Sequence, residues 1–245
     1  MFDSLLIIVP VYNEEENILR TLGQIETNIN TPHKNLLIYS YDEDKTVPVV
    51  KRFISENKVD NTRLVKNLYG KGVLDAIITG FRSAENDEVV LVTMADLSDD
   101  LTIVDSMFEK INQGYDIVCG SRYMKGGQHL GGPKFKKMLS KMAGLTLHFL
   151  TGIPTHDISN SFKMYRNSIV SDIKIESRGG FEVSMEIVVK SFLKGYSITE
   201  IPSIWRDRVA GESNFKMRKW LPEYFRWYIY ALKGSLNNKF FKHIS

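Results

Sequence analysis

The sequence has few of the residues that characterise several common kinds of protein. It contains one cysteine, Cys119, which rules out an internal disulfide and is typical of a reducing compartment. It has no apolar run of 18 residues, and its N-terminus, MFDSLLIIVPVYNEE, lacks the basic start of a signal peptide. We therefore expect a cytoplasmic protein that neither spans a membrane nor follows the secretory route.

Several signature motifs are also missing. No G-x-G-x-x-G turn follows the first apolar run, and no G-x-x-x-x-G-K-[ST] occurs, so neither a dinucleotide-binding fold nor a phosphate-loop NTPase is supported. The five histidines lack the spacing of a zinc site, and C-x-x-C and G-x-S-x-G are absent. The remaining candidates for chemistry are carboxylates in the first half of the chain and cations further on.

The 245 residues, 43% apolar and 25% charged, are typical of an ordinary globular domain, alone or with an appendage. The net charge of +3 is unevenly distributed. Residues 206–245 hold nine Lys/Arg and three Asp/Glu, a net +6, so the first 205 residues carry −3. A basic C-terminal part indicates an anionic partner or surface there.

Apolar runs that predict strands alternate with patterns that predict helices. The strands are expected at 5–11, 36–41, 88–94 and 116–120, and the helices at 14–26, 47–57, 72–83 and 103–112. This alternation indicates an α/β fold with a mostly parallel sheet. Ligands bind at the carboxyl ends of the strands in such sheets, where this chain has YNEEEN, YDEDKT and ADLSDD.

The chain changes character after Gly120. The segment SRYMKGGQHLGGPKFKK, with four glycines and five basic residues, predicts a mobile, cationic loop. Helical patterns follow at 135–150 and 181–193, then a strand-like stretch at 196–205 and an aromatic helix candidate at 219–236.

Acidic strand ends combined with basic loops suit an enzyme that handles a nucleotide diphosphate. Carboxylates can bind a nucleoside or a divalent metal, whereas Arg and Lys neutralise phosphate. The stretch VTMADLSDD (92–100) alone is ambiguous, because its carboxylates fit either a metal site or a capped turn.

Six motifs in order, VPVYNEEENI, YDEDKT, ADLS, GSRYMKGG, DISNSFKMYR and DRVAGES, resemble glycosyltransferase family 2, in its dolichol-phosphate mannose synthase-like branch. The resemblance covers about residues 6–216. It implies a GT-A-type, Rossmann-like, mostly parallel sheet flanked by helices in a single catalytic domain, 1–216. We expect residues 217–245 to form a C-terminal amphipathic helix that contacts a membrane surface.

The resemblance implies a set of nucleotide-binding residues. Tyr41 stands where the family's first aspartate would be, and Asp44 where a serine would be. The residues expected around the nucleotide are Pro10, Tyr12, Glu14, Asp42 and Asp44.

The resemblance also implies a Mg²⁺ or Mn²⁺ ion held by Asp96 and Ser98, with Asp96 serving in catalysis. Family members commonly have Asp-Ala-Asp here, but this chain has Met94-Ala95-Asp96. Loss of one acid need not abolish binding, because diphosphate and water oxygens complete the octahedron. Asp99 or Asp100 can supply a second carboxylate, or can cap the helix that begins near Leu101.

Matched cations complete the implied site. Arg122 and Arg208 correspond to arginines that contact phosphate and assist catalysis, and Lys141 stands where relatives often carry another arginine. Asp157 aligns with an aspartate near the acceptor, and Ser213 with a polar neighbour of Arg208. The residue after it is Asn214 where the family often has lysine, so Lys216 is the expected substitute.

The expected function is inverting transfer of a sugar, mannose or glucose, from a nucleotide diphosphate sugar of the GDP-mannose or UDP-glucose type to a polyprenyl or dolichyl phosphate. Relatives that use a hydroxyl acceptor usually offer a carboxylate as the base, often in a Glu-Asp pair at a helix start, and processive relatives add Q-x-x-R-W. Neither pattern is identified here. A phosphate monoester needs no such base, because its second pKa is about 6. Aromatic and basic residues at 218–233 suggest peripheral contact with the cytosolic face of a membrane. A membrane-protein partner is a further expectation. We expect no nucleic-acid partner.

Two alternatives stay open at this point. One is transfer to a saccharide hydroxyl during cell-surface polysaccharide or glycan assembly. The other is a catalytically silent subunit that only binds a sugar nucleotide, suggested by the departures at Tyr41, Met94 and Asn214.

Overall fold

The computed structural model describes residues 1–85, 88–208 and 217–242. Its strands are β1 (Leu5–Pro10), β2 (His33–Tyr39), β3 (Thr62–Lys66), β4 (Val89–Val92), β5 (Ile117–Ser121), β6 (Gln128–Leu130), β7 (Lys163–Arg166), β8 (Ile198–Pro202) and β9 (Ile204–Arg206). Its helices are α1 (Ile18–Asn28), α2 (Thr46–Asn57), α3 (Val73–Ser83), the 3₁₀ turn η1 (Leu101–Ile103), α4 (Val104–Asn112), α5 (Lys134–Thr151), α6 (Asn167–Ser171), α7 (Val183–Lys194) and α8 (Met217–Lys242).

Seven strands form one twisted, mostly parallel sheet in the order β3-β2-β1-β4-β7-β5-β8. Only β7 runs antiparallel, between β4 and β5. β6 and β9 form a separate parallel pair. This arrangement confirms the α/β class and all the predicted strands. Strands β3, β6 and β7 were not predicted, because their short sequences, TRLVK, QHL and KMYR, contain polar or charged residues and form no apolar run.

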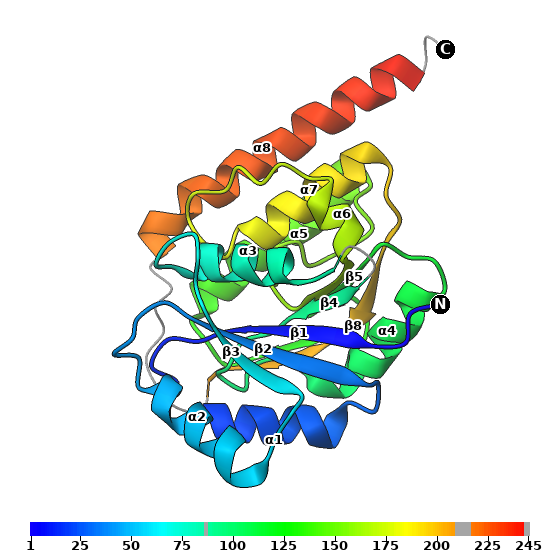
Figure 1. Ribbon diagram of the computed structural model, residues 1–245. Helices are drawn as coiled ribbons and strands as arrows, with labels where there is room; N and C mark the ends of the chain where they lie inside the picture. The colour runs from blue at the N-terminus through cyan, green and yellow to red at the C-terminus, as the bar shows by residue number, and fades with distance from the viewer. Residues whose placement is uncertain (86–87, 209–216, 243–245) are drawn as a thin grey trace.

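Helices cover both faces of the sheet (Figure 1). The alternating residues of β1 point to opposite faces. Ile7 packs in a cluster with residues of α1, α2 and α4, and Ile8 packs with residues of α3, α5, α7 and α8. The resulting three-layer domain brings the carboxyl ends of β1, β2 and β4 to one edge.

The C-terminal helix α8 packs against α5 and α7, and Figure 1 shows it lying across the outside of the upper helical layer. Trp227 is 1% exposed and donates its indole N–H to the Ser177 hydroxyl at 3.1 Å, and Trp220 is also buried. These two tryptophans belong to the core, so their assignment to a membrane interface was wrong. Phe225 and Leu236 are exposed on the same helix, and an amphipathic α8 is not confirmed.

The segment predicted as a cationic loop holds regular structure instead. It contains β6 and the first residues of α5. The strand-like stretch at 196–205 divides into β8 and β9, and β9 leaves the main sheet to pair with β6. None of the helices in the part of the chain that the structure describes is long and apolar enough to cross a membrane.

Candidate active site

The loop after β4 presents Asp96 and is held in place by β9. The Asp96 Oδ1 atom accepts the N–H of Ser98 at 3.2 Å. The Ser98 carbonyl accepts the N–H of Arg206 at 3.0 Å, and Asp100 Oδ2 accepts the N–H of Ile204 at 3.0 Å. Asp100 therefore links the loop to β9, and strand β9 fixes the position of Asp96.

Arg208, two residues beyond β9, brings the first and last motifs together. Its Nη2 donates to Asp96 Oδ2 at 2.9 Å, and its Nη1 lies 3.9 Å from Glu14 Oε1. The other Glu14 oxygen accepts Asn17 Nδ2 at 2.8 Å. Burial raises the pKa of Glu14, and the nearby Asp96 charge adds to the shift. The sequence motifs predicted residues 14, 96 and 208 for the site but not that they contact one another.

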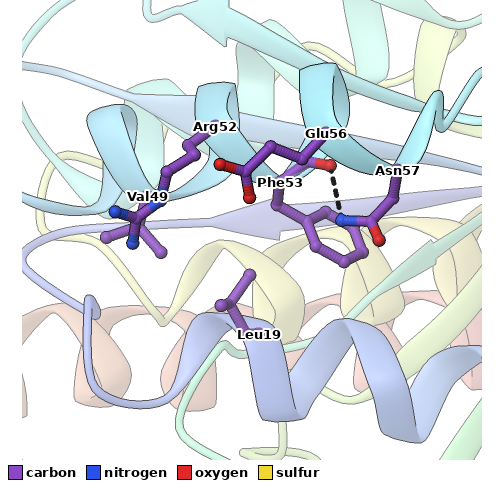
Figure 2. Close-up of a pocket in the computed structure, with 6 residues that line it drawn as sticks. All are labelled: Leu19, Val49, Arg52, Phe53, Glu56 and Asn57. Atoms are coloured by element: carbon purple, nitrogen blue, oxygen red, sulfur yellow. Dashed lines mark hydrogen bonds between the residues drawn. The ribbon is translucent and has the colours of Figure 1, made fainter.

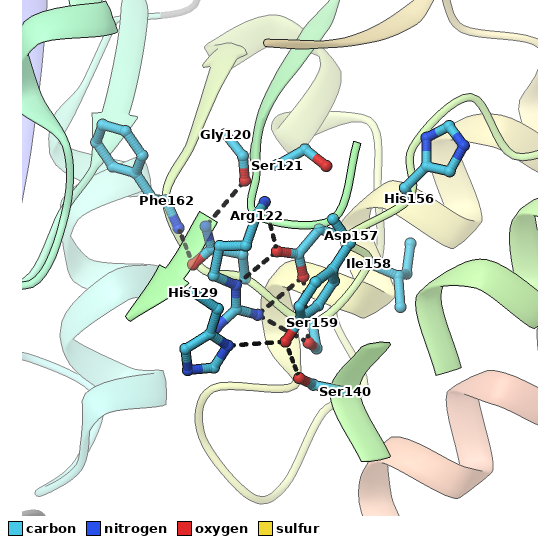
Figure 3. Close-up of polar contacts among 12 residues, drawn as sticks. Gly120, Ser121, Arg122, His129, Ser140, His156, Asp157, Ile158, Ser159 and Phe162 are labelled. Carbon is cyan, nitrogen blue, oxygen red and sulfur yellow. Dashed lines mark hydrogen bonds and ion pairs between the residues drawn. The ribbon is translucent and has the colours of Figure 1, made fainter. Parts of the chain in front are cut away.

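A second cluster lies beyond β5, where Arg122 forms a bidentate ion pair with Asp157 (Figure 3). Arg122 Nε lies 2.6 Å from Asp157 Oδ2, and its Nη2 lies 2.8 Å from Oδ1 and 3.2 Å from the Ser159 hydroxyl. Asp157 is fully buried, which opposes ionisation, but the Arg122 guanidinium holds the pKa of this carboxyl below its ordinary value. The sequence predicted both residues for the site but not that they bind each other.

A buried lysine holds the loop that carries Asp157. Lys163 of β7 is 0% exposed and donates to the carbonyls of Ile158 and Asn160. Gly144 of α5 lies against the backbone of His156, where a Cβ atom would collide with the His156 carbonyl. Lys163 and Gly144 therefore set the position of the carboxylate that orients Arg122.

Sequence reasoning did not single out Lys136, and it underrated Asp99. Burial lowers the pKa of Lys136, and the charges of Arg122 and Arg208 lower it further. Burial and the Asp96 charge raise the pKa of Asp99 to about 7. Asp99 Oδ2 accepts the Thr93 hydroxyl at 2.9 Å, so its carboxylate lies beside the Asp96 loop and does not cap η1. The KFKK run was the only sequence signal for Lys136.

Of the predicted nucleotide residues, Pro10 ends β1 and Tyr12 follows it, exposed. The Tyr12 ring lies 5.6 Å from that of Tyr41, centroid to centroid. Asp42, exposed at the end of β2, pairs with Lys66 Nζ at 2.5 Å. These residues line the edge of the sheet that the motifs predicted.

Asp44 differs from the other predicted nucleotide residues because it is buried. Its Oδ1 accepts the N–H groups of Asn13 at 3.1 Å and Thr46 at 2.9 Å. It thus ties the loop after β1 to the start of α2. A direct contact with the nucleotide stays a prediction.

Three predicted site residues remain: Lys141, Ser213 and Lys216. Lys141 is an exposed residue of α5. Ser213 and Lys216 lie outside the residues that the structure describes.

The donor set near Asp96 is suited to a hard divalent cation. Among residues 1–85, 88–208 and 217–242, no three His, Cys, Asp or Glu side chains are grouped so that they could hold a metal alone. Burial raises the pKa values of Glu14 and Asp99, the Asp96 charge adds to both shifts, and a cation would favour the ionised forms. Asp96 and Ser98 fit an ion that takes most of its ligands from a diphosphate and water.

His129 of β6 lies beside the segment that carries Arg122. The Tyr123 hydroxyl bonds both His129 Nδ1, at 2.9 Å, and the Ser140 hydroxyl. Burial lowers the pKa of His129 to about 4, with contributions from Arg122 and Lys137. The imidazole is therefore neutral at pH 7 and supports the segment that carries Arg122.

The low pKa of His129 predicts a loss of stability in mild acid. Below its ordinary pKa of 6.5 the unfolded chain takes up a proton, which the folded chain does not accept until about pH 4. The free energy of unfolding should therefore fall as the pH is lowered through this window. Urea denaturation at pH 7 and pH 5 should show a smaller decrease for His129→Gln than for the wild type. Equal decreases would contradict a neutral, buried His129.

A pocket of about 310 Å³ lies elsewhere, between α1 and α2 (Figure 2). Leu19 lines one side, and Phe53 and Glu56 line the other. None of its lining residues belongs to the clusters around Asp96 and Arg122, so we do not assign it to the candidate active site.

Comparison with known proteins identifies a family and several relatives that this chain resembles. The model of the family Glycosyl transferase family 2 matches residues 6–174. A dolichol-phosphate mannosyltransferase of Pyrococcus furiosus is 32% identical over 231 residues, which are 92% of this chain, and this chain spans 62% of that protein's length. A dolichyl-phosphate hexose transferase of Haloferax volcanii is 27% identical over 86% of each chain.

A solved structure shares the fold. It is glucosyl-3-phosphoglycerate synthase from Mycobacterium tuberculosis, in complex with Mn²⁺, uridine diphosphate and phosphoglyceric acid. The similarity has a TM-score of 0.66 at 13% identity and covers 95% of this chain and 78% of that one. The predicted GT-A-type architecture is confirmed.

Proposed function

Because the chain belongs to glycosyl transferase family 2, we propose that it transfers a sugar, with inversion, from a nucleotide diphosphate sugar to a polyprenyl phosphate. The names of the Pyrococcus and Haloferax relatives support the lipid phosphate acceptor. The observation that carries the proposal is the contact of Arg208 with Asp96 and Glu14. It joins an anion-binding cation to the carboxylates at the carboxyl ends of β1 and β4.

The nucleoside part of the donor would lie along the edge formed by the ends of β1 and β2. Pro10 and Tyr12 supply an apolar and aromatic surface there, and Glu14 and Asp42 supply hydrogen-bond acceptors. Asp44 would act by holding the loop of Asn13 and Glu14 in place.

The diphosphate would lie between the two clusters. Arg122 and Arg208 would donate to its oxygens, with Lys141, Ser213 and Lys216 as further contacts. Asp96 and Ser98 would hold Mg²⁺ or Mn²⁺. When bound, such an ion acts as a Lewis acid that stabilises the negative charge of the departing diphosphate.

The reaction would be a direct displacement at the anomeric carbon. A phosphate oxygen of the acceptor forms the new bond to that carbon from the side opposite the nucleotide, which inverts the configuration. The bond to the diphosphate breaks, and its electron pair leaves with the nucleoside diphosphate. No proton has to be removed, because the acceptor phosphate is mostly ionised near pH 7. The residues of this chain have to orient the two phosphates and balance their charge; Asp157 would orient Arg122 and lie near the acceptor.

Product chemistry tests this proposal. Incubation with radiolabelled GDP-mannose or UDP-glucose, Mn²⁺ and a polyprenyl phosphate should give label that extracts into organic solvent and is released by mild acid. Label found only in a water-soluble saccharide would favour a hydroxyl acceptor. Nucleotide binding without turnover of any donor would favour a silent binding subunit. A thermal-shift screen of nucleotide sugars with Mn²⁺ would identify the base.

The role of Arg208 gives a graded prediction. Lysine keeps the charge but cannot contact Asp96 and a phosphate oxygen through one planar fork. We expect Arg208→Lys to lower kcat by roughly 10-fold, since one charge-assisted hydrogen bond contributes about 1.5 kcal/mol or more. Arg206→Lys, two residues earlier, is the control and should keep the wild-type rate. Wild-type kcat in Arg208→Lys would remove this arginine from the phosphate site.

We also propose that the protein works at the cytosolic face of a membrane, where a polyprenyl phosphate would present its headgroup. It would bind there peripherally, alone or with a membrane-protein partner.

A further inference from the structure

Helix α5 carries a stripe of large apolar side chains on its outer surface. Phe135, Met138, Met142 and Phe149 are spaced three, four and seven residues apart, which places them on one face of the helix. Each is about half exposed or more, and Phe149 is 86% exposed. Exposed residues of this size are individually ordinary, but a continuous stripe of them marks an interaction surface.

The opposite face of the same helix contacts the candidate active site. Lys137 Nζ donates to the His129 carbonyl at 2.6 Å, and the Ser140 hydroxyl bonds Tyr123. Tyr123 follows Arg122 in the chain, so this face of α5 adjoins the Arg122 cluster. One helix therefore separates the phosphate-binding cations from the outer apolar stripe.

Helix α8 extends this surface. The Tyr228 hydroxyl donates to Thr146 of α5 at 2.8 Å, so the two helices lie side by side. Leu221 and Phe225 precede Tyr228 by seven and three residues, on the same side of α8, and both are exposed. The exposed Leu221 and Phe225 thus lie on the side of α8 that adjoins α5.

The charge on α5 has one sign. The helix contains four lysines and no Asp or Glu, and Lys134 and Lys141 are exposed beside the stripe. A second copy of the chain, docked by a two-fold axis on this face, would bring lysines against lysines without acids from α5 to pair with them. An apolar stripe flanked by lysines suits the headgroup region of an anionic bilayer, where the side chains can enter the acyl boundary.

We propose that the α5 stripe (Phe135, Met138, Met142 and Phe149), together with the adjoining Leu221 and Phe225 of α8, is the surface that docks on an anionic lipid bilayer. The inference deepens the proposed function, on which it rests, because it explains how a lipid phosphate reaches the cations behind α5. It assigns bilayer binding mainly to α5, whereas the sequence predicted α8 alone.

Vesicle flotation tests the docking surface without requiring turnover. The wild type should float with phosphatidylcholine vesicles that contain phosphatidylglycerol, and much less with phosphatidylcholine alone. Met142→Glu/Phe149→Glu should bind the anionic vesicles at least about 10-fold more weakly, because two apolar side chains that would enter the acyl boundary become charged. Leu19→Glu, at an exposed position on α1, is the matched control and should float like the wild type.

Two further measurements separate the possible failures. With a short-chain polyprenyl phosphate in detergent, the double variant should keep the wild-type rate, and with a vesicle-embedded acceptor it should lose most activity. If no variant and no wild-type sample transfers sugar, the proposed function fails while the flotation result still judges the docking surface. Unchanged flotation of the double variant would overturn the inference. So would a lipid-free dimer, seen by sedimentation velocity, that the double variant abolishes.

Discussion

Replacement of Asp96 by asparagine should lower kcat for sugar transfer by about 10²–10³, as expected when one preorganised electrostatic contact to the departing group is lost. The amide keeps the size of the side chain and an acceptor for the Ser98 N–H, so the loop should keep its shape. It loses the negative charge that pairs with Arg208 and that would hold the metal. The variant should also need more Mn²⁺ to reach its own maximal rate.

Steady-state kinetics at varied Mn²⁺ concentrations measure both effects. The matched control is Asp100→Asn in the same loop, whose carboxylate accepts the Ile204 N–H and the Thr102 hydroxyl. It should lose some stability but less than 10-fold in kcat, because the Asp100 carboxylate contacts the protein itself. If Asp96→Asn kept both the wild-type rate and its Mn²⁺ dependence, the assignment of this site would be wrong.

The position of Met94 is explained by its neighbours. Its side chain packs against the core on the α3 and α5 face, while its N–H donates to Asp99 at 3.1 Å. The carboxylate of Asp99 therefore lies beside the backbone of Met94, although Asp99 follows it by five residues in the sequence. The loop after β4, residues 93–100, thus brings back an acid to the aligned position that lacks one. Whether Asp99 contacts the metal stays a prediction.

Sequence motifs predicted the edge of the sheet where the site lies, because the carboxyl ends of parallel strands meet in space. The closeness of Glu14 and Asp96 follows from this rule, whereas Arg208 reaches them from β9, which lies outside the main sheet. The pairing of Arg122 with Asp157 does not follow from the rule, because it depends on β7 returning antiparallel between β4 and β5. A four-residue strand gives no periodic signal that would reveal such a return.

The tryptophans of α8 illustrate a second limit. Aromatic residues among lysines and arginines are typical of a membrane interface, but they are equally compatible with a helix that packs on a domain. Trp227 is buried, and the Lys190 ammonium lies 4.9 Å from its ring centroid. Only the tertiary contact with α7 distinguishes the two cases. In contrast, the exposed stripe of α5 could not be identified from the sequence, because the sequence does not show which face of this helix is exposed.

Replacement of Arg122 by methionine should destabilise the protein by about 3–5 kcal/mol, since it leaves the Asp157 carboxylate buried without its partner. Asp157→Asn should cost less, because the neutral amide can still accept one hydrogen bond from the guanidinium. The loss of stability in Arg122→Met should be greatest near neutral pH. Asp157 has a lowered pKa in the folded protein, so the pair stabilises the fold above the ordinary carboxyl pKa of 3.8 and loses this effect as pH falls through the folded value.

The double variant Arg122→Met/Asp157→Leu separates the structural effect from the chemical one. Removal of both charges should recover most of the stability lost in Arg122→Met, since replacing a buried pair by apolar groups is often nearly neutral. Urea denaturation of the wild type, Arg122→Met, Asp157→Leu and the double variant gives the coupling free energy, which should be at least about 2 kcal/mol for such a pair. If Arg122 also contacts the diphosphate, the stable double variant should still transfer sugar at least about 100-fold more slowly. A double variant that is both stable and fully active would show that the pair serves the fold alone, whereas additive losses of stability would contradict the coupling that the 2.6 Å contact implies.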